Sequence, residues 1–236
     1  MSDYRRLETQ LTTDLNLQRR PVAVTFLSTP PDGVEQYEGV QPSGCSFWKM
    51  ASEGRTFYTV AADHYNCPIG SYTHNIALPP ERASELEGTL GFMTSIGYLR
   101  MDEVPGIPRL AETPGVVVYA PLGATPVDPD VVLFWGPPGK VMLLQEAALR
   151  AGVAAQLSTL GRPTCMVIPA ALSHGTVAST GCIGNRVYTG LDDADLYVAV
   201  PGTDLRRIAE ETATVRAANA TLLEYHQGRK RELARA

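Results

Sequence analysis

The sequence has no long apolar run. None of its stretches approaches the roughly 20 consecutive apolar residues that a membrane-spanning helix needs. Its first 20 residues contain four arginines and no apolar core, so they do not match a secretory signal. These absences predict a cytoplasmic protein with no membrane partner.

The chain also has little charge, and no excess of positive charge. Lys and Arg number 20 against 25 Asp and Glu, which gives a net charge of −5 and no field that would attract nucleic acid. Charged residues make up 19% and apolar residues 44%, a balance typical of a globular protein that buries a core. We therefore expect a folded body without a nucleic-acid partner.

Cysteine is scarce, and its spacing lacks a zinc-finger pattern. The four cysteines, Cys45, Cys67, Cys165 and Cys182, lie 22, 98 and 17 positions apart, so no two form a C-x-x-C pair. Scattered loops can still converge in a fold of this size. In a reducing compartment we expect metal ligands or reactive thiols rather than structural disulfides.

Common nucleotide and hydrolase motifs are missing as well. The stretch WGPPGKV (135–141) is similar to a phosphate loop, but Phe134 stands where its first glycine belongs. Val141 replaces the hydroxyl residue that would bind magnesium. The chain has no G-x-S-x-G or H-E-x-x-H motif either, which excludes the usual signatures of α/β-hydrolases and zinc proteases.

Short apolar runs and helical patterns alternate along the whole chain, which predicts an α/β or α+β fold: a compact mixed sheet with flanking helices and a long C-terminal helix. The expected strands are 21–27, 55–62, 115–122, 130–136, 164–172 and 196–202. The expected helices are 7–15, 45–54, 80–100, 140–152 and a final one from Thr203, with an apolar stripe from Leu205 to Tyr225. We expect one domain over 1–236, with two intimate lobes divided near 110–125 as the alternative.

Three cysteines stand in surroundings unlike those of a packed core. Cys45 and Cys67 each precede a helix-like segment, where unpaired backbone N–H groups stabilise a thiolate. Cys182 lies between Gly181 and Gly184, whose bare backbone would leave N–H groups free to bond sulfur, as in iron–sulfur proteins. Cys165 is followed by apolar residues, so it is either a ligand or part of the core.

Four further residues are candidates for the chemistry of the site. His64, three positions before Cys67, is a possible extra ligand or proton donor, and its neighbour Tyr65 is a second catalytic candidate. Asn185 follows Cys182 closely and is a candidate cofactor contact. Arg186 is a candidate for holding an anionic substrate, because its guanidinium binds carboxylates bidentately; a surface salt bridge is the simpler interpretation.

The remaining histidines and tyrosines carry weaker predictions. We expect His74 and His174 at the surface or in turns, and His226 at the surface. Tyr72 and Tyr188 can line a pocket, as Tyr65 can, or belong to an aromatic core.

Six segments, four of which contain a cysteine, together resemble one known family. The segments are RRPVAVTFL, CSFWKMASEG, AADHYNCPIG, GRPTCMVIPAAL, STGCIGNRVYTGL and LYVAVPG. In this combination and order the chain resembles the family named domain of unknown function 169, from Arg20 to the last helix. The resemblance implies that all four cysteines belong to recurrent motifs, and it supplies no reaction.

The leading hypothesis is an iron–sulfur protein, with a 4Fe–4S cluster held by three or four of the cysteines. If Cys165 does not ligate, one iron is open to His64, water or a substrate, which suits a lyase acting on a small polar molecule. Four ligands would instead suit an oxidoreductase or sensor with an electron-transfer partner.

Three alternatives stay open beside it. The same thiolates can bind zinc. Cys182 or Cys67 can act as a nucleophile without metal, with His64 as the base. The chain can also be a non-enzymatic ligand-binding or regulatory module. A homo-oligomer is open too, because the final helix can pack on its own body or on a second subunit.

Overall fold

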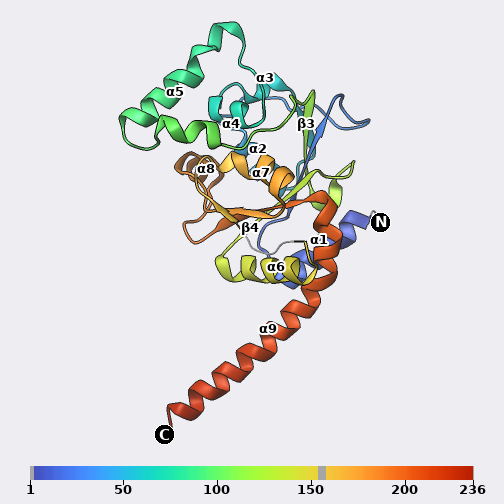
Figure 1. Ribbon diagram of the computed structural model, residues 1–236. Helices are drawn as coiled ribbons and strands as arrows, with labels where there is room; N and C mark the ends of the chain where they lie inside the picture. Colours follow the sequence, from blue (N-terminus) through green and yellow to red (C-terminus); the bar gives the residue numbers. More distant parts are fainter. Residues whose placement is uncertain (1–2, 154–157, 236) are drawn as a thin grey trace.

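The computed structural model describes residues 3–153 and 158–235, and its central element is one mixed β-sheet (Figure 1). Within the described residues the sheet has seven strands in the order β2-β3-β1-β4-β7-β6-β5. Neighbouring strands are antiparallel except β5 and β6, which are parallel. The strands are β1 (Val22–Leu27), β2 (Phe57–Thr59), β3 (Val116–Pro121), β4 (Val131–Gly136), β5 (Ser158–Leu160), β6 (Val177–Ser179) and β7 (Leu196–Pro201).

The central strands are buried on both faces. In β4, Val131 and Leu133 point into one core, and Val132 and Phe134 point into the other. Leu133 lies opposite Val22 of β1 on one side of β4, and all of β4 is buried. A strand covered on both faces needs apolar residues at every position, which explains its short β-branched run.

Helices cover both faces of this sheet (Figure 1). One face packs against α1 (Asp3–Leu15), α6 (Pro138–Arg150) and the first turns of α9 (Leu205–Leu233). The other packs against α2 (Cys45–Ser52) and α7 (Val167–His174), and α8 (Ile183–Thr189) lies on α2. The predicted α/β class, mixed sheet and long C-terminal helix are confirmed.

A smaller group of helices extends from the α2 side of the sheet (Figure 1). It contains α3 (Ala61–His64), α4 (Pro68–Thr73) and α5 (Ser84–Ser95). Leu90 is the one buried residue of α5, so this helix is loosely attached. The 3₁₀ turns of the chain are η1 (Pro80–Arg82), η2 (Met101–Gly106), η3 (Leu122–Ala124), η4 (Thr164–Met166) and η5 (Gly202–Asp204).

Helix α9 leaves the body of the protein halfway along its length (Figure 1). Its buried residues end at Val215, whereas Leu222 and Tyr225 are 54% and 64% exposed. The predicted stripe from Leu205 to Tyr225 is therefore buried only in its first half. None of the helices in the described part of the chain is long and apolar enough to cross a membrane.

One predicted strand is wrong, and another is too long. The run 164–172 is helical, as η4 followed by α7. A short apolar run looks the same in a buried strand and in a helix buried on most sides, so its periodicity could not decide between them. The strand predicted over 55–62 ends at Thr59, where the chain turns into α3.

Candidate functional site

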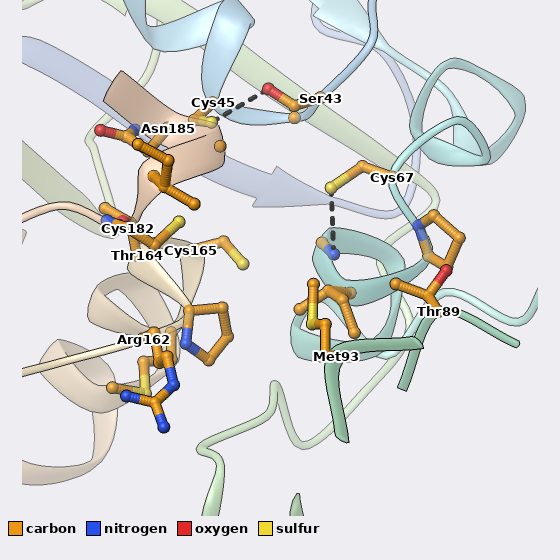
Figure 2. Close-up of a pocket in the computed structure, with 18 of the residues that line it drawn as sticks. Ser43, Cys45, Cys67, Thr89, Met93, Arg162, Thr164, Cys165, Cys182 and Asn185 are labelled. Carbon is orange, nitrogen blue, oxygen red and sulfur yellow. Dashed lines mark hydrogen bonds between the residues drawn. The ribbon is translucent and has the colours of Figure 1, made fainter. Parts of the chain in front are cut away.

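All four cysteines line one cavity of about 530 Å³ (Figure 2). Each comes from a different segment: Cys45 begins α2, Cys67 precedes α4, Cys165 lies in η4, and Cys182 precedes α8. Figure 2 shows their sulfur atoms around a common space. The fold thus brings together thiols that are far apart in the sequence.

Contacts between the four segments explain this convergence. Helix α2 packs against α8, and α4 packs against η4, so the cysteine-bearing segments meet in pairs. The hydroxyl of Thr164 accepts a hydrogen bond from the backbone N–H of Cys182, which joins the Cys165 segment to the start of α8. These contacts depend on tertiary packing, which is why the spacing of the cysteines carried no sign of them.

The helix starts predicted at Cys45 and Cys67 are confirmed. Pro68 occupies the first turn of α4, where its missing N–H needs no partner. The N–H of Gly70 donates to Cys67 Sγ over 3.3 Å. We expected backbone N–H groups near Cys182 to bond its sulfur. The N–H of Gly181 does not, because it donates to the Ser179 hydroxyl.

Burial favours the neutral thiol at Cys45, Cys67 and Cys165. It raises the pKa of Cys45 to about 11, although Ser43, whose hydroxyl lies 3.0 Å from Cys45 Sγ, and Asn185 lower it in part. Burial also raises the pKa of Cys67, and that of Cys165 well above its usual value. Negative charge on neighbouring cysteines raises these values further. A stable set of thiolates here requires a positive centre between them.

Asn185 is the buried polar group of the cavity wall. It is 1% exposed and lies beside Cys45 (Figure 2), close enough to lower the pKa of that thiol, but neither amide atom makes a well-aligned hydrogen bond in the described part of the chain. Buried amides without partners are rare, because desolvation without a hydrogen bond costs about 1–3 kcal/mol. Asn185 thus lines the cavity, and its role as a cofactor contact stays a prediction.

His64 does not line the cavity. Its Nε2 atom lies 2.8 Å from the Thr59 hydroxyl, and its Nδ1 atom lies behind Gly44, which does line the cavity. Burial, and then the charge of His74, lower the pKa of His64 to about 3, so its imidazole is neutral. His74 was expected at the surface or in a turn; it lies in the turn after α4, but it is 2% exposed and stacks on His64 with ring centroids 5.7 Å apart.

Arg186 and Tyr65 also lie outside the cavity lining. The guanidinium of Arg186 donates to the carbonyl oxygens of Thr180, Asp192 and Asp195, so it ties two loops together. The fork that we expected to bind a substrate carboxylate is therefore used within the protein. Tyr65 is half-buried and contributes nothing to the cavity wall.

Of the other tyrosines, Tyr188 lines the cavity, which was one of its two expected placements, and Tyr72 does not. The ring of Tyr72 instead packs under the guanidinium of Arg109, 4.3 Å from its centroid.

Several lining residues were missed in the sequence. Arg162, Tyr98 and Glu103 all face the cavity, and Arg162 lies over the Tyr98 ring at 4.8 Å. Arg162 stands three positions before Cys165, which was a usable signal. Tyr98 and Glu103 come from a segment without cysteine, so nothing local marked them.

In the described ranges, no group of three or more His, Cys, Asp or Glu side chains is arranged to hold a metal ion. The four thiols line the same cavity without forming such a group.

Comparisons with known proteins show to which family this chain belongs. No solved structure matches the chain. An uncharacterized protein of Methanocaldococcus jannaschii, MJ0308, is 27% identical over 201 residues, which cover 80% of this chain and 84% of that protein. The sequence model of domain of unknown function 169 (DUF169), described as uncharacterised ArCR, matches residues 10–211 and so includes every residue that lines the cavity. The chain therefore belongs to the DUF169 family.

Proposed function

We propose that this protein binds a 4Fe–4S cluster through three or four of its cysteines. The observation that carries the proposal is the convergence of Cys45, Cys67, Cys165 and Cys182 on one cavity (Figure 2). Cysteine thiolates are the usual ligands of such clusters. The four cationic irons would supply the positive centre that these buried thiols need in order to lose their protons.

The size of the cavity favours a cluster over a single zinc ion. A zinc ion binds its thiolates directly at about 2.3 Å, so its ligands crowd together. In a 4Fe–4S cluster, irons and sulfides lie between the thiolates and hold them further apart. The described side chains contain no group of three or more that could hold a single metal ion, but the four thiols line one cavity of about 530 Å³.

Polar groups beside the sulfurs support the same proposal. The Gly70 N–H donates to Cys67 Sγ, and the Ser43 hydroxyl lies against Cys45 Sγ. Hydrogen bonds to ligand sulfurs stabilise the thiolate and tune the reduction potential of a cluster. Asn185 adds a buried amide whose two polar atoms are available to the cluster or to a molecule bound to it.

The role of Cys165 decides which chemistry the cluster would support. With Cys165 as the fourth ligand, the site suits electron transfer or sensing. Without it, one iron is open and acts as a Lewis acid on a small polar molecule. The cavity volume of about 530 Å³ falls in the range typical of small-molecule sites, which favours the open form.

A metal-free thiol enzyme fits the geometry less well. A nucleophilic cysteine needs a lowered pKa or an adjacent base. Burial raises the pKa of Cys67, and the expected base, His64, binds Thr59 outside the cavity.

Oxygen-free purification tests the proposal. We expect a brown protein with broad absorption near ~400 nm and matching amounts of iron and acid-labile sulfide. Cys45→Ser, Cys67→Ser and Cys182→Ser should each lose the cluster, and Cys165→Ser separates three ligands from four. Ser52→Ala is the matched control, because Ser52 is buried on α2 but does not line the cavity. Colourless protein that takes up no iron during reconstitution, or stoichiometric zinc, would contradict the proposal.

A further inference from the structure

The cavity has two chemically different ends. Figure 2 shows Asn185 and Cys45 toward one end and Met93 and Arg162 toward the other, and Leu90, Leu99 and Ile107 add further apolar lining. We call this second end the mouth, and it also contains Tyr98, Glu103 and Arg162. Figure 2 shows the guanidinium of Arg162 on the side of the cavity away from Asn185 and Cys45.

Arg162 and Glu103 are the charged side chains among the described lining residues. Their closest atoms, Arg162 Nη2 and Glu103 Oε2, are 3.4 Å apart, longer than a good charge-assisted hydrogen bond of about 2.7–2.9 Å. Both side chains are 42% exposed. This pair is therefore weak, and it leaves most of the donors of Arg162 available to a ligand.

The Tyr98 ring lies against this guanidinium. Arg162 Cζ lies 4.8 Å from the ring centroid, within the range of a cation–π contact. A guanidinium stacked in this way keeps its edge N–H groups directed sideways, where they can bind a planar carboxylate with two hydrogen bonds.

Glu103 would not be left without a cation if Arg162 turned to a ligand. Arg100 Nε lies 3.9 Å from Glu103 Oε1, and Arg100 itself does not line the cavity. Arg162 can therefore release Glu103 and bind a ligand carboxylate at a small cost in free energy. Arg100 retains its closer partner, Asp102, at 2.9 Å.

We infer that the mouth binds the carboxylate of a small molecule with an apolar body, through Arg162 and the wall of Leu90, Met93, Leu99 and Ile107. The inference rests on the proposed cluster only for the reactive end of the cavity, toward which the body of the ligand extends. It gives Arg162 the role that the sequence had suggested for Arg186.

Calorimetric titration with octanoate and with octan-1-ol tests the inference. The two probes share an apolar chain, and only octanoate carries a charge. The titrations use oxygen-protected protein whose iron and sulfide have been measured. We expect octanoate to bind more tightly than octan-1-ol.

Variants of the Arg162 pair sharpen the test. Arg162→Gln should weaken octanoate binding roughly ten- to a hundredfold, as expected for a lost hydrogen-bonded charge. It should leave octan-1-ol binding unchanged. Glu103→Gln should strengthen octanoate binding, because it removes the competing carboxylate. Arg100→Gln removes the same charge outside the cavity and leaves Glu103 to Arg162 alone, so it should weaken octanoate binding far less than Arg162→Gln does. Circular dichroism confirms that each variant is folded.

Three results would overturn the inference: no binding of octanoate, equal binding of both probes, or equal losses in Arg162→Gln and Arg100→Gln. Octanoate binding that depends on Arg162 in protein without iron would support the inference while the proposed cluster fails. Protein that contains its cluster but does not bind octanoate would support the proposed cluster and overturn the inference.

Discussion

Gly70 donates its N–H to Cys67 Sγ over 3.3 Å, and a Cβ atom on Gly70 would lie only 2.9 Å from the same sulfur. The glycine thus allows the backbone of α4 to approach the thiol and bond it. Any larger residue must push the sulfur aside. The absence of a side chain at Gly70 therefore determines where the sulfur of Cys67, a proposed cluster ligand, can lie.

We predict that Gly70→Ala lowers the iron content of the protein without unfolding it. The displaced sulfur should weaken cluster binding, whereas alanine gains up to about 1 kcal/mol of helix propensity that offsets the strain. Iron and sulfide analysis measures the first effect, and urea unfolding of the cluster-free protein measures the second. Gly184→Ala is the matched control, because its Cβ would meet only Tyr188 at an ordinary 3.7 Å. Equal iron losses in both variants would contradict this account.

We predict that Asn185→Leu stabilises the cluster-free protein. The substitution removes a buried amide without hydrogen-bond partners in the described residues and replaces it with an apolar group of similar size. The free energy of unfolding should rise by about 1–2 kcal/mol, and the iron content should fall. Urea denaturation and iron analysis measure the two effects.

A partnered asparagine provides the comparison for this variant. Asn219 donates to Glu146 from helix α9, so Asn219→Leu should give no such gain. If Asn185→Leu destabilised the cluster-free protein, its amide would have a structural role instead.

Local features of the site could be predicted from the sequence, because they depend on neighbouring residues. The helix starts at Cys45 and Cys67 follow from turn residues and from Pro68. The central strands follow from their β-branched runs. Which cysteines meet depends on the packing of α2 on α8 and of α4 on η4, and no local pattern encodes that packing.

The unexpected surroundings of His74 and Arg186 also arise from tertiary packing that no local pattern encodes. His74 stands in a polar stretch, SYTHN, which favours a turn, yet it is buried against His64 by the packing of α4. Arg186 was predicted to bind an anionic substrate because a guanidinium can bind a carboxylate bidentately. Its side chain turns to three carbonyl oxygens that become neighbours only when residues 192–195 fold back on Thr180.

We predict that stability falls as the pH decreases from about 6.5 toward 4. Burial lowers the pKa of His64 to about 3 and that of His74 to about 4, so both imidazoles stay neutral in the folded protein. In the unfolded chain each takes up a proton near pH 6.5. Each histidine should therefore reduce the free energy of unfolding by up to about 1.4 kcal/mol per pH unit in this window.

Urea unfolding at several pH values checks this prediction. His74→Leu should make the pH dependence shallower, since one of the two proton uptakes disappears. His226→Leu, at an exposed position of α9, should leave it unchanged. A slope that is the same in all three proteins would mean that carboxylates alone cause the acid sensitivity.

Arg186 is expected to act on stability and not on ligand binding. Arg186→Met removes the hydrogen bonds to Thr180, Asp192 and Asp195, which should cost about 2 kcal/mol of unfolding free energy for a partly buried charged donor. The loop before Cys182 should loosen, so the cluster should be lost more readily under oxygen. Octanoate affinity should be unchanged in protein with its cluster intact, because Arg186 does not line the cavity. A selective loss of octanoate binding with normal stability would instead give Arg186 the substrate-binding role that its sequence position first suggested.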